Sequence, residues 1–84
     1  MHMPWIVYIL ECKDKTLYTG ITNHMESRLA KHAKGAGAKY TRGRGPLKVV
    51  YTETRRTKSS ALKREAAIKS LRREQKLELI RDHS

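Results

Sequence analysis

The first strongly hydrophobic segment of the chain is Pro4–Cys12, in which six consecutive apolar residues run from Trp5 to Leu10. β-branched and aromatic side chains dominate this run, and both of its alternate faces are apolar. Such a pattern is typical of a strand that is covered on both sides. It therefore predicts a central strand.

A polar break, Lys13–Lys15, separates this segment from a second apolar stretch, Thr16–Thr22. Three residues are enough for a β-hairpin, and the left-handed turn position that usually takes glycine would fall to Lys15. A three-residue loop pairs Cys12 with Thr16. Because directly opposite residues project from the same face of a sheet, this register predicts one shared face for four residues: Tyr8, Leu10, Tyr18 and Gly20.

Helix signals follow the hairpin. Asn23 with Glu26 three residues later makes a capping-box pattern, which predicts a helix from there to about Lys34. Its apolar stripe is Met25, Leu29 and Ala33. A glycine-rich loop, Gly35–Pro46, comes next.

The rest of the chain predicts one more strand and two helices. Leu47–Thr54 alternates as a strand, and Thr57, Ser59 or Ser60 can cap a helix over about Ala61–Lys69. Ser70 can cap a last helix, which carries Leu77 and Ile80. The order β-β-α-β-α-α predicts an α+β fold, with a three-stranded antiparallel sheet flanked by helices, in a single domain over 1–84 with its core at about 4–81.

Charge narrows the function. The 84 residues include 19 Lys and Arg against 8 Asp and Glu, a net charge of +11. Such an excess indicates a polyanionic partner, with nucleic acid the first candidate and an acidic membrane surface the second. A single Cys12, expected to be inert, excludes a disulfide framework and a cysteine-based zinc finger. Without a signal-peptide pattern or a run long enough to span a membrane, we expect a reduced, cytoplasmic setting.

Two tyrosines are candidates for chemistry. Tyr8 and Tyr18 would flank Gly20, where a ligand can approach the backbone closely. A phenol whose proton leaves readily can act as a general base or proton relay. The alternative is that both are ordinary sheet residues.

Two residues of the first helix are also candidates. Arg28 and His32 lie one turn apart, so both would face the same side. Arginine can hold a phosphodiester with a fork of donors, and histidine can exchange a proton near neutral pH. The alternative is a solvated helix face.

Glu65 is the least expected residue of the chain. On a helical projection it falls between Ala61, Leu62 and Ile68, inside an apolar arc. A buried carboxylate needs a cation or a hydrogen-bond partner. A divalent metal would satisfy it, and so would an i, i+4 pair with Lys69.

The glycine-rich loop has basic residues around one aromatic, a composition that suits a phosphate backbone with a stacked base. The alternative is a flexible solvated loop. The candidate nucleic-acid contacts are Lys34, Lys39, Tyr40, Arg42 and Arg44.

Taken together, these residues resemble the GIY-YIG nuclease domain. The resemblance rests on Val7-Tyr8 followed by Tyr18-Thr19-Gly20, with Arg28, His32 and a helix that carries Glu65. The stretches L-Y-T-G-I-T-N, G-A-K-Y-T-R-G-R-G-P-L and A-L-K-R-E-A-A-I-K are similar to the small stand-alone bacterial members, the YhbQ-like group.

The resemblance implies roles for individual residues. Tyr8 would be the candidate general base near the attacking water, and Tyr18 would position water or phosphate. Arg28 would stabilise the transition state, with His32 one turn further on. Glu65 would be the protein ligand of one divalent ion, Mg²⁺ or Mn²⁺, since Mg²⁺ keeps waters and takes phosphate oxygens readily.

The implied activity is metal-dependent endonucleolytic hydrolysis of phosphodiester bonds in repair or processing, on DNA rather than RNA, without a small-molecule cofactor or a membrane. The first motif reads I-V-Y rather than G-I-Y, and the Asn that many members carry near the domain's end is missing. A non-catalytic nucleic-acid-binding module with a vestigial active site is therefore the alternative.

Overall fold

The protein, seen in a computed structural model, is described over residues 4–33 and 47–83, without the side chains of residues 31–33. The elements follow the expected order β-β-α-β-α-α. They are β1 (Trp5–Glu11), β2 (Leu17–Thr22), α1 (Met25–Ala33), β3 (Lys48–Arg55), α2 (Lys58–Lys69) and α3 (Arg73–His83).

The sheet is antiparallel with the order β2-β1-β3, so the doubly apolar strand is indeed central. The predicted hairpin register is confirmed, because Tyr8 pairs with Gly20 and Leu10 pairs with Tyr18. The turn also forms as expected, since Lys15 has a φ of 70°.

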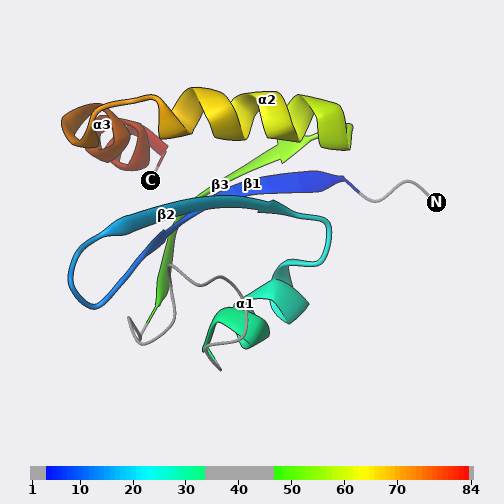
Figure 1. Ribbon diagram of the computed structural model, residues 1–84, viewed down its shortest axis with the longest axis horizontal. Coiled ribbons are helices and arrows are strands. Elements are labelled where there is room, and N and C mark those ends of the chain that lie inside the picture. The colour runs from blue at the N-terminus through cyan, green and yellow to red at the C-terminus, as the bar shows by residue number, and fades with distance from the viewer. Residues whose placement is uncertain (1–3, 34–46, 84) are drawn as a thin grey trace.

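The helices form layers on the two faces of the sheet (Figure 1). α2 and α3 lie on one side, and α1 lies on the other. The main core forms under α2 and α3, where Val7 and Ile9 of β1 pack with Tyr51 of β3 and with Ala61 and Ile68 of α2. Since side chains alternate along a strand, Tyr8 projects from the opposite face to Val7 and Ile9.

Three local expectations were wrong. α1 begins one residue late, because the carbonyl of His24, not Asn23, accepts the first helical bond, from the Arg28 N–H. Ser70 ends α2 and caps no later helix, and the Gln75 side chain accepts instead from the Arg72 N–H. Val50 is the extra residue of a β-bulge, which interrupts the simple alternation predicted for β3.

Thr57 is the N-cap of α2, one of the three candidates from the sequence. Its hydroxyl accepts from the Ser60 N–H at 3.1 Å. α2 therefore begins at Lys58, three residues earlier than expected, and positions Glu65 near its middle. Within residues 4–33 and 47–83, no helix is long and apolar enough to span a membrane.

A carboxylate that the sequence did not single out ties β3 to α2. Glu53 accepts two hydrogen bonds from Arg64 Nε, both at 3.0 Å, and one from the Tyr51 hydroxyl. Arg55 adds an ion pair at 2.8 Å. Burial alone would raise the pKa of Glu53, but these partners outweigh it and the pKa is lowered, so the carboxylate stays charged and holds α2 in place.

The strained turn generates a stability prediction. Lys15→Gly should stabilise the fold by about 1 kcal/mol, because glycine adopts a positive φ without a steric cost. The Glu11–Lys15 ion pair that is lost spans 3.8 Å at an exposed side chain and is worth little. Chemical denaturation measures the change. Lys13→Gly is the control, since Lys13 does not have a positive φ, and an equal gain in both variants would contradict the explanation.

Candidate active site

Two tyrosine rings enclose Gly20. The Tyr8 ring, fully buried, and the half-buried Tyr18 ring have centroids 6.3 Å apart and are tilted by 44°. A Cβ on Gly20 would lie 2.6 Å from Tyr8 Oη and 3.1 Å from Tyr18 Cε1. Position 20 therefore needs glycine for space, because any side chain would displace the Tyr8 ring.

Arg28, on helix α1, reaches both tyrosines. Its Nε donates a hydrogen bond to Tyr8 Oη at 3.5 Å, and its guanidinium also interacts with the Tyr18 hydroxyl. The bond with Tyr8 is the largest reason why the pKa of Arg28 is raised, although partial burial opposes it. A permanent cation therefore stands beside both phenols.

The pKa of Tyr8 is raised. Burial is the main cause, the hydrogen bond from Arg28 opposes it, and the nearby Tyr18 and Glu65 add to the rise. At neutral pH Tyr8 is therefore a neutral hydroxyl rather than a phenolate. It can pass on a proton while it accepts another, but it does not stand ready as a strong base.

Glu65 comes from α2, on the far side of the sheet. α2 lies against β1 and the edge strand β2, and the charge of Glu65 acts on Tyr8. Its side chain is 19% exposed, between the buried Ala61 and Ile68 as expected. Leu62 is different, since it is 45% exposed and belongs to the outer surface.

Glu65 also makes the pair that the sequence allowed as an alternative. Lys69 Nζ lies 3.5 Å from its carboxylate, and the Lys69 side chain is 55% exposed. A lysine that is half in solvent can leave the carboxylate when another cation arrives. The pair therefore does not exclude a metal at Glu65.

The side chains of this cluster suit only one kind of divalent-metal site. No group of three or more His, Cys, Asp and Glu side chains suited to a metal occurs among the described residues. A single carboxylate suits Mg²⁺, which binds through one or two carboxylates, keeps several waters and takes substrate phosphates. It does not suit zinc, which takes three or four protein ligands.

The remaining predicted residues are only partly visible. His32 lies in α1, one turn after Arg28, but its side chain is not among those described. The predicted nucleic-acid contacts, namely Lys34, Lys39, Tyr40, Arg42 and Arg44, lie outside the described residues.

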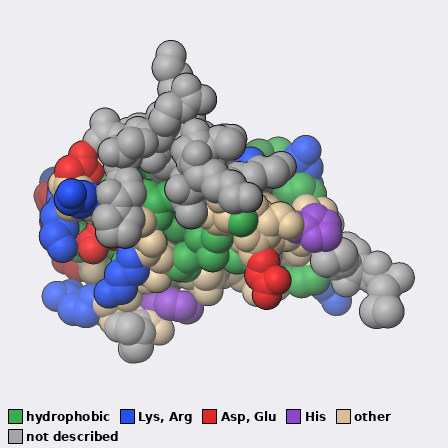
Figure 2. Space-filling model, turned by 90° about the horizontal axis from the view of Figure 1, so that it is seen from below, with side chains coloured by type: hydrophobic (Ala, Val, Ile, Leu, Met, Phe, Trp, Pro, Cys, Tyr) green, Lys and Arg blue, Asp and Glu red, His purple; other side chains and the backbone are tan. Residues whose placement is uncertain are grey.

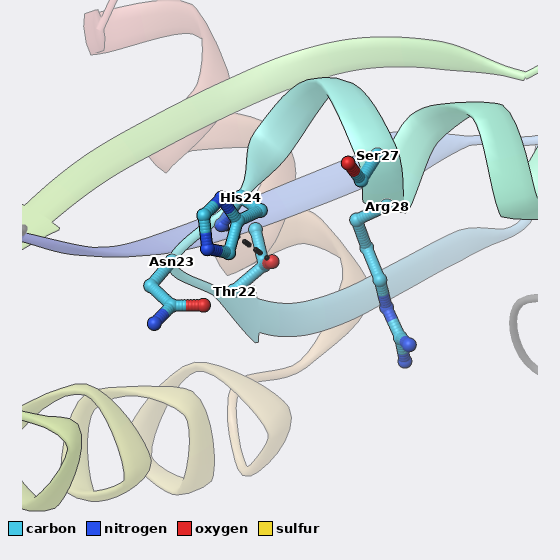
Figure 3. A pocket seen from close by; sticks show the side chains of 5 residues that line it. All are labelled: Thr22, Asn23, His24, Ser27 and Arg28. Carbon is cyan, nitrogen blue, oxygen red and sulfur yellow. Dashed lines mark hydrogen bonds between the residues drawn. The ribbon is translucent and has the colours of Figure 1, made fainter.

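A hollow beside Arg28 was missed by the sequence analysis. It has a volume of 410 Å³ and is lined by Thr22, Asn23, His24, Ser27 and Arg28 (Figure 3). The His24 N–H donates to Thr22 Oγ1 at 3.0 Å and so shapes the entry to α1. The polar side chain of Asn23 could have indicated this hollow. The capping-box pattern instead predicts Asn23 as the cap of the helix, so it is not among the candidate binding residues.

The chain is similar to known proteins over most of its length. The family model described as the GIY-YIG catalytic domain matches residues 4–78. A UPF0213 protein of Clostridium perfringens is 58% identical over 78 residues, which are 93% of this chain and 84% of that protein. A UPF0213 protein of Natronomonas pharaonis is 53% identical over 78 residues, with 93% and 92% covered.

Two solved structures share the fold. The solution NMR structure of a UPF0213 protein from Bacillus halodurans has a TM-score of 0.61 and 49% identity, over 93% of this chain and 83% of that one. The NMR structure of a protein from E. faecalis has a TM-score of 0.65 and 38% identity, over 95% of this chain and 86% of that one.

The catalytic domain implies nuclease activity in general, and hence a nucleic-acid substrate. By sequence and by fold, the chain belongs to the GIY-YIG family, among its small UPF0213 relatives.

Proposed function

We propose that this protein is an endonuclease that hydrolyses phosphodiester bonds with one divalent metal ion, Mg²⁺ or Mn²⁺. DNA is its proposed substrate, in repair or processing. The observation that carries the proposal is the cluster of Tyr8, Tyr18 and Arg28 around Gly20, with the charge of Glu65 acting on Tyr8.

The cluster offers the groups that phosphodiester hydrolysis needs. Arg28 is a permanent cation, and its fork of donors can stabilise the charge that develops on the phosphate. The Tyr8 hydroxyl can take a proton from an attacking water while its own proton moves on, and His32, one turn after Arg28, is the proposed acceptor. Tyr18 would hold the water or a phosphate oxygen.

Glu65 is the proposed metal ligand. A divalent ion there would stabilise the charge on the phosphate and on the leaving oxygen. To bind the metal, Glu65 must exchange its Lys69 partner for it. The basic residues outside the described ranges, Lys34, Lys39, Arg42 and Arg44 with Tyr40, remain the proposed contacts to the polyanion.

A second function has one observation in its favour. The Glu65–Lys69 ion pair satisfies the carboxylate without any metal. A nucleic-acid-binding module with a vestigial active site would keep this pair permanently. The cleavage experiment below separates the two functions.

Replacing the proposed metal ligand tests the activity directly. Glu65→Gln keeps the side-chain size but removes the charge that a hard divalent cation needs. On a panel of single-stranded, duplex, flapped and branched DNA and RNA, metal-dependent cleavage should collapse while binding persists. Glu78→Gln is the matched control, because Glu78 is an exposed carboxylate on α3, and it should cleave like the wild type.

Equal cleavage by wild type and folded Glu65→Gln would remove Glu65 from the mechanism. No cleavage of any substrate by the wild type, with Mg²⁺ or Mn²⁺, would favour the binding module.

Removing one hydroxyl tests the proton relay. Tyr8→Phe should lower the cleavage rate by about 10² to 10⁴ with little change in affinity. Because the pKa of Tyr8 is raised, its hydroxyl is protonated at neutral pH. The wild-type rate at neutral pH should therefore not depend on a Tyr8 phenolate. Tyr51→Phe is the control, since it removes a hydroxyl on the α2 side of the sheet. A folded Tyr8→Phe protein that cuts at the wild-type rate would exclude the relay.

The space at position 20 gives a third test. In Gly20→Ala the new Cβ would lie 2.6 Å from Tyr8 Oη and 2.8 Å from Cζ, so the ring must move and its bond with Arg28 is lost. The cleavage rate should fall at least as far as in Tyr8→Phe. The cleavage rate of the double variant Tyr8→Phe with Gly20→Ala should be little lower than that of Gly20→Ala alone, because both changes act through the Tyr8 hydroxyl. Fully additive losses would show that Gly20 acts independently of Tyr8.

A further inference from the structure

The edge strand β2 connects two surface hollows with the proposed active site between them. The first hollow is the one beside Arg28, lined by Thr22, Asn23, His24, Ser27 and Arg28. The second, of 240 Å³, lies near the other end of β2 and is lined by Leu17, Tyr18, Thr19, Lys69 and Lys76.

Each hollow shares residues with the proposed active site. The first includes Arg28, which bonds to Tyr8. The second includes Tyr18, whose ring faces Tyr8, and Lys69, the partner of Glu65. A strand that contacts both Arg28 and Tyr18 can therefore reach both hollows.

We propose that one strand of the nucleic acid lies along the outer edge of β2, from the hollow at Lys76 past Tyr18 and Arg28 to the hollow at Asn23 and Ser27. This inference rests on the proposed function and gives the path of the substrate through that site. Asn23, Ser27 and Lys76 would hold the strand on both sides of the cleaved bond.

The length of the edge suits such a strand. β2 has six residues and extends for about 17 Å at the usual rise of a strand. Successive phosphates of one strand are about 3.4 Å apart when measured along a duplex axis and further apart along the strand itself, so only a few would lie along β2. Within the described residues β2 pairs only with β1, so it is an edge strand of the described sheet.

Charge favours a phosphate strand at the Lys76 end. Arg73, one turn before Lys76 on α3, donates to the Lys15 carbonyl at 2.9 Å and so joins α3 to the hairpin turn. Figure 2 shows Lys and Arg side chains gathered at the left end of the molecule, with Asp and Glu side chains among them, where Figure 1 places that turn and α3. Among the acidic groups at this end, Glu11, Glu65 and Glu74 are each paired with a lysine or an arginine, and Asp14 accepts hydrogen bonds from Thr16.

Side chains at the other end mark where the path stops. Asn23, His24, Ser27 and Arg28 line the first hollow without a carboxylate (Figure 3). The adjoining hollow, of 280 Å³, shares three of these residues but also includes Glu26 and Met25. Its carboxylate would repel a phosphate, so the strand would leave the protein before Glu26.

Binding without divalent ions tests the path separately from cleavage. With a single-stranded DNA of 16 nucleotides, Lys76→Ala should weaken binding and reduce the slope of log K against log salt by about 0.7, the value for one phosphate contact of a single strand. Lys63→Ala, at an exposed position on α2, is the matched control and should leave the slope unchanged. Equal slopes in the two variants would overturn the proposal.

A tethered strand tests the direction. Cys12 is 3% exposed, so a new thiol in Lys76→Cys can be linked selectively to a thiol at one end of an oligonucleotide. A photoreactive base a few nucleotides along should crosslink to the peptide that contains Asn23 and Ser27, for one of the two strand polarities. The same tether at Lys63→Cys should not. Crosslinks outside that peptide for both polarities would overturn the path.

The two kinds of failure are distinguishable. Tethered crosslinking and binding need no metal and no bond cleavage. A protein that crosslinks as expected but never cuts would keep the β2 path and lose the nuclease mechanism. A protein that cuts in a Glu65-dependent way but crosslinks elsewhere would keep the mechanism and lose the path.

Discussion

The site depends on one close approach, between the Tyr8 ring and the backbone of Gly20. The β1–β2 register places these two residues opposite one another, and the missing side chain leaves room for the phenol. With Tyr8 held there, its hydroxyl meets Arg28 from α1. A one-residue slip of the hairpin would move every side chain of β2 to the other face and separate the whole cluster.

Two partly buried carboxylates, Glu53 and Glu65, have different partners. Glu53 accepts bonds from Tyr51 and Arg64 and anchors α2 to β3, and these partners lower its pKa although burial opposes this. Glu65, on the same helix, keeps a single exposed partner, Lys69. One carboxylate is therefore structural, while the other has a partner that a stronger cation can replace.

One face of the sheet carries the main core and the other carries the tyrosine–arginine cluster. α2 and α3 cover the face of Val7 and Ile9, where the main core forms. α1 lies on the other side (Figure 1) and brings Arg28 to the tyrosines. Because α2 also lies against the edge strand β2, Glu65 can act on Tyr8 although its helix belongs to the core side. The cluster of Tyr8, Tyr18 and Arg28 thus lies beside the edge strand of the described sheet.

The sequence alone determined the elements, their order and the hairpin register, because these follow from local patterns: a doubly apolar run, a three-residue break and alternation around Gly20. It also singled out Tyr8, Tyr18, Arg28 and Glu65. Only the tertiary structure decided what depends on packing between distant segments. Val50 forms a bulge opposite β1 and Glu53 anchors α2, since each is settled by residues of another element.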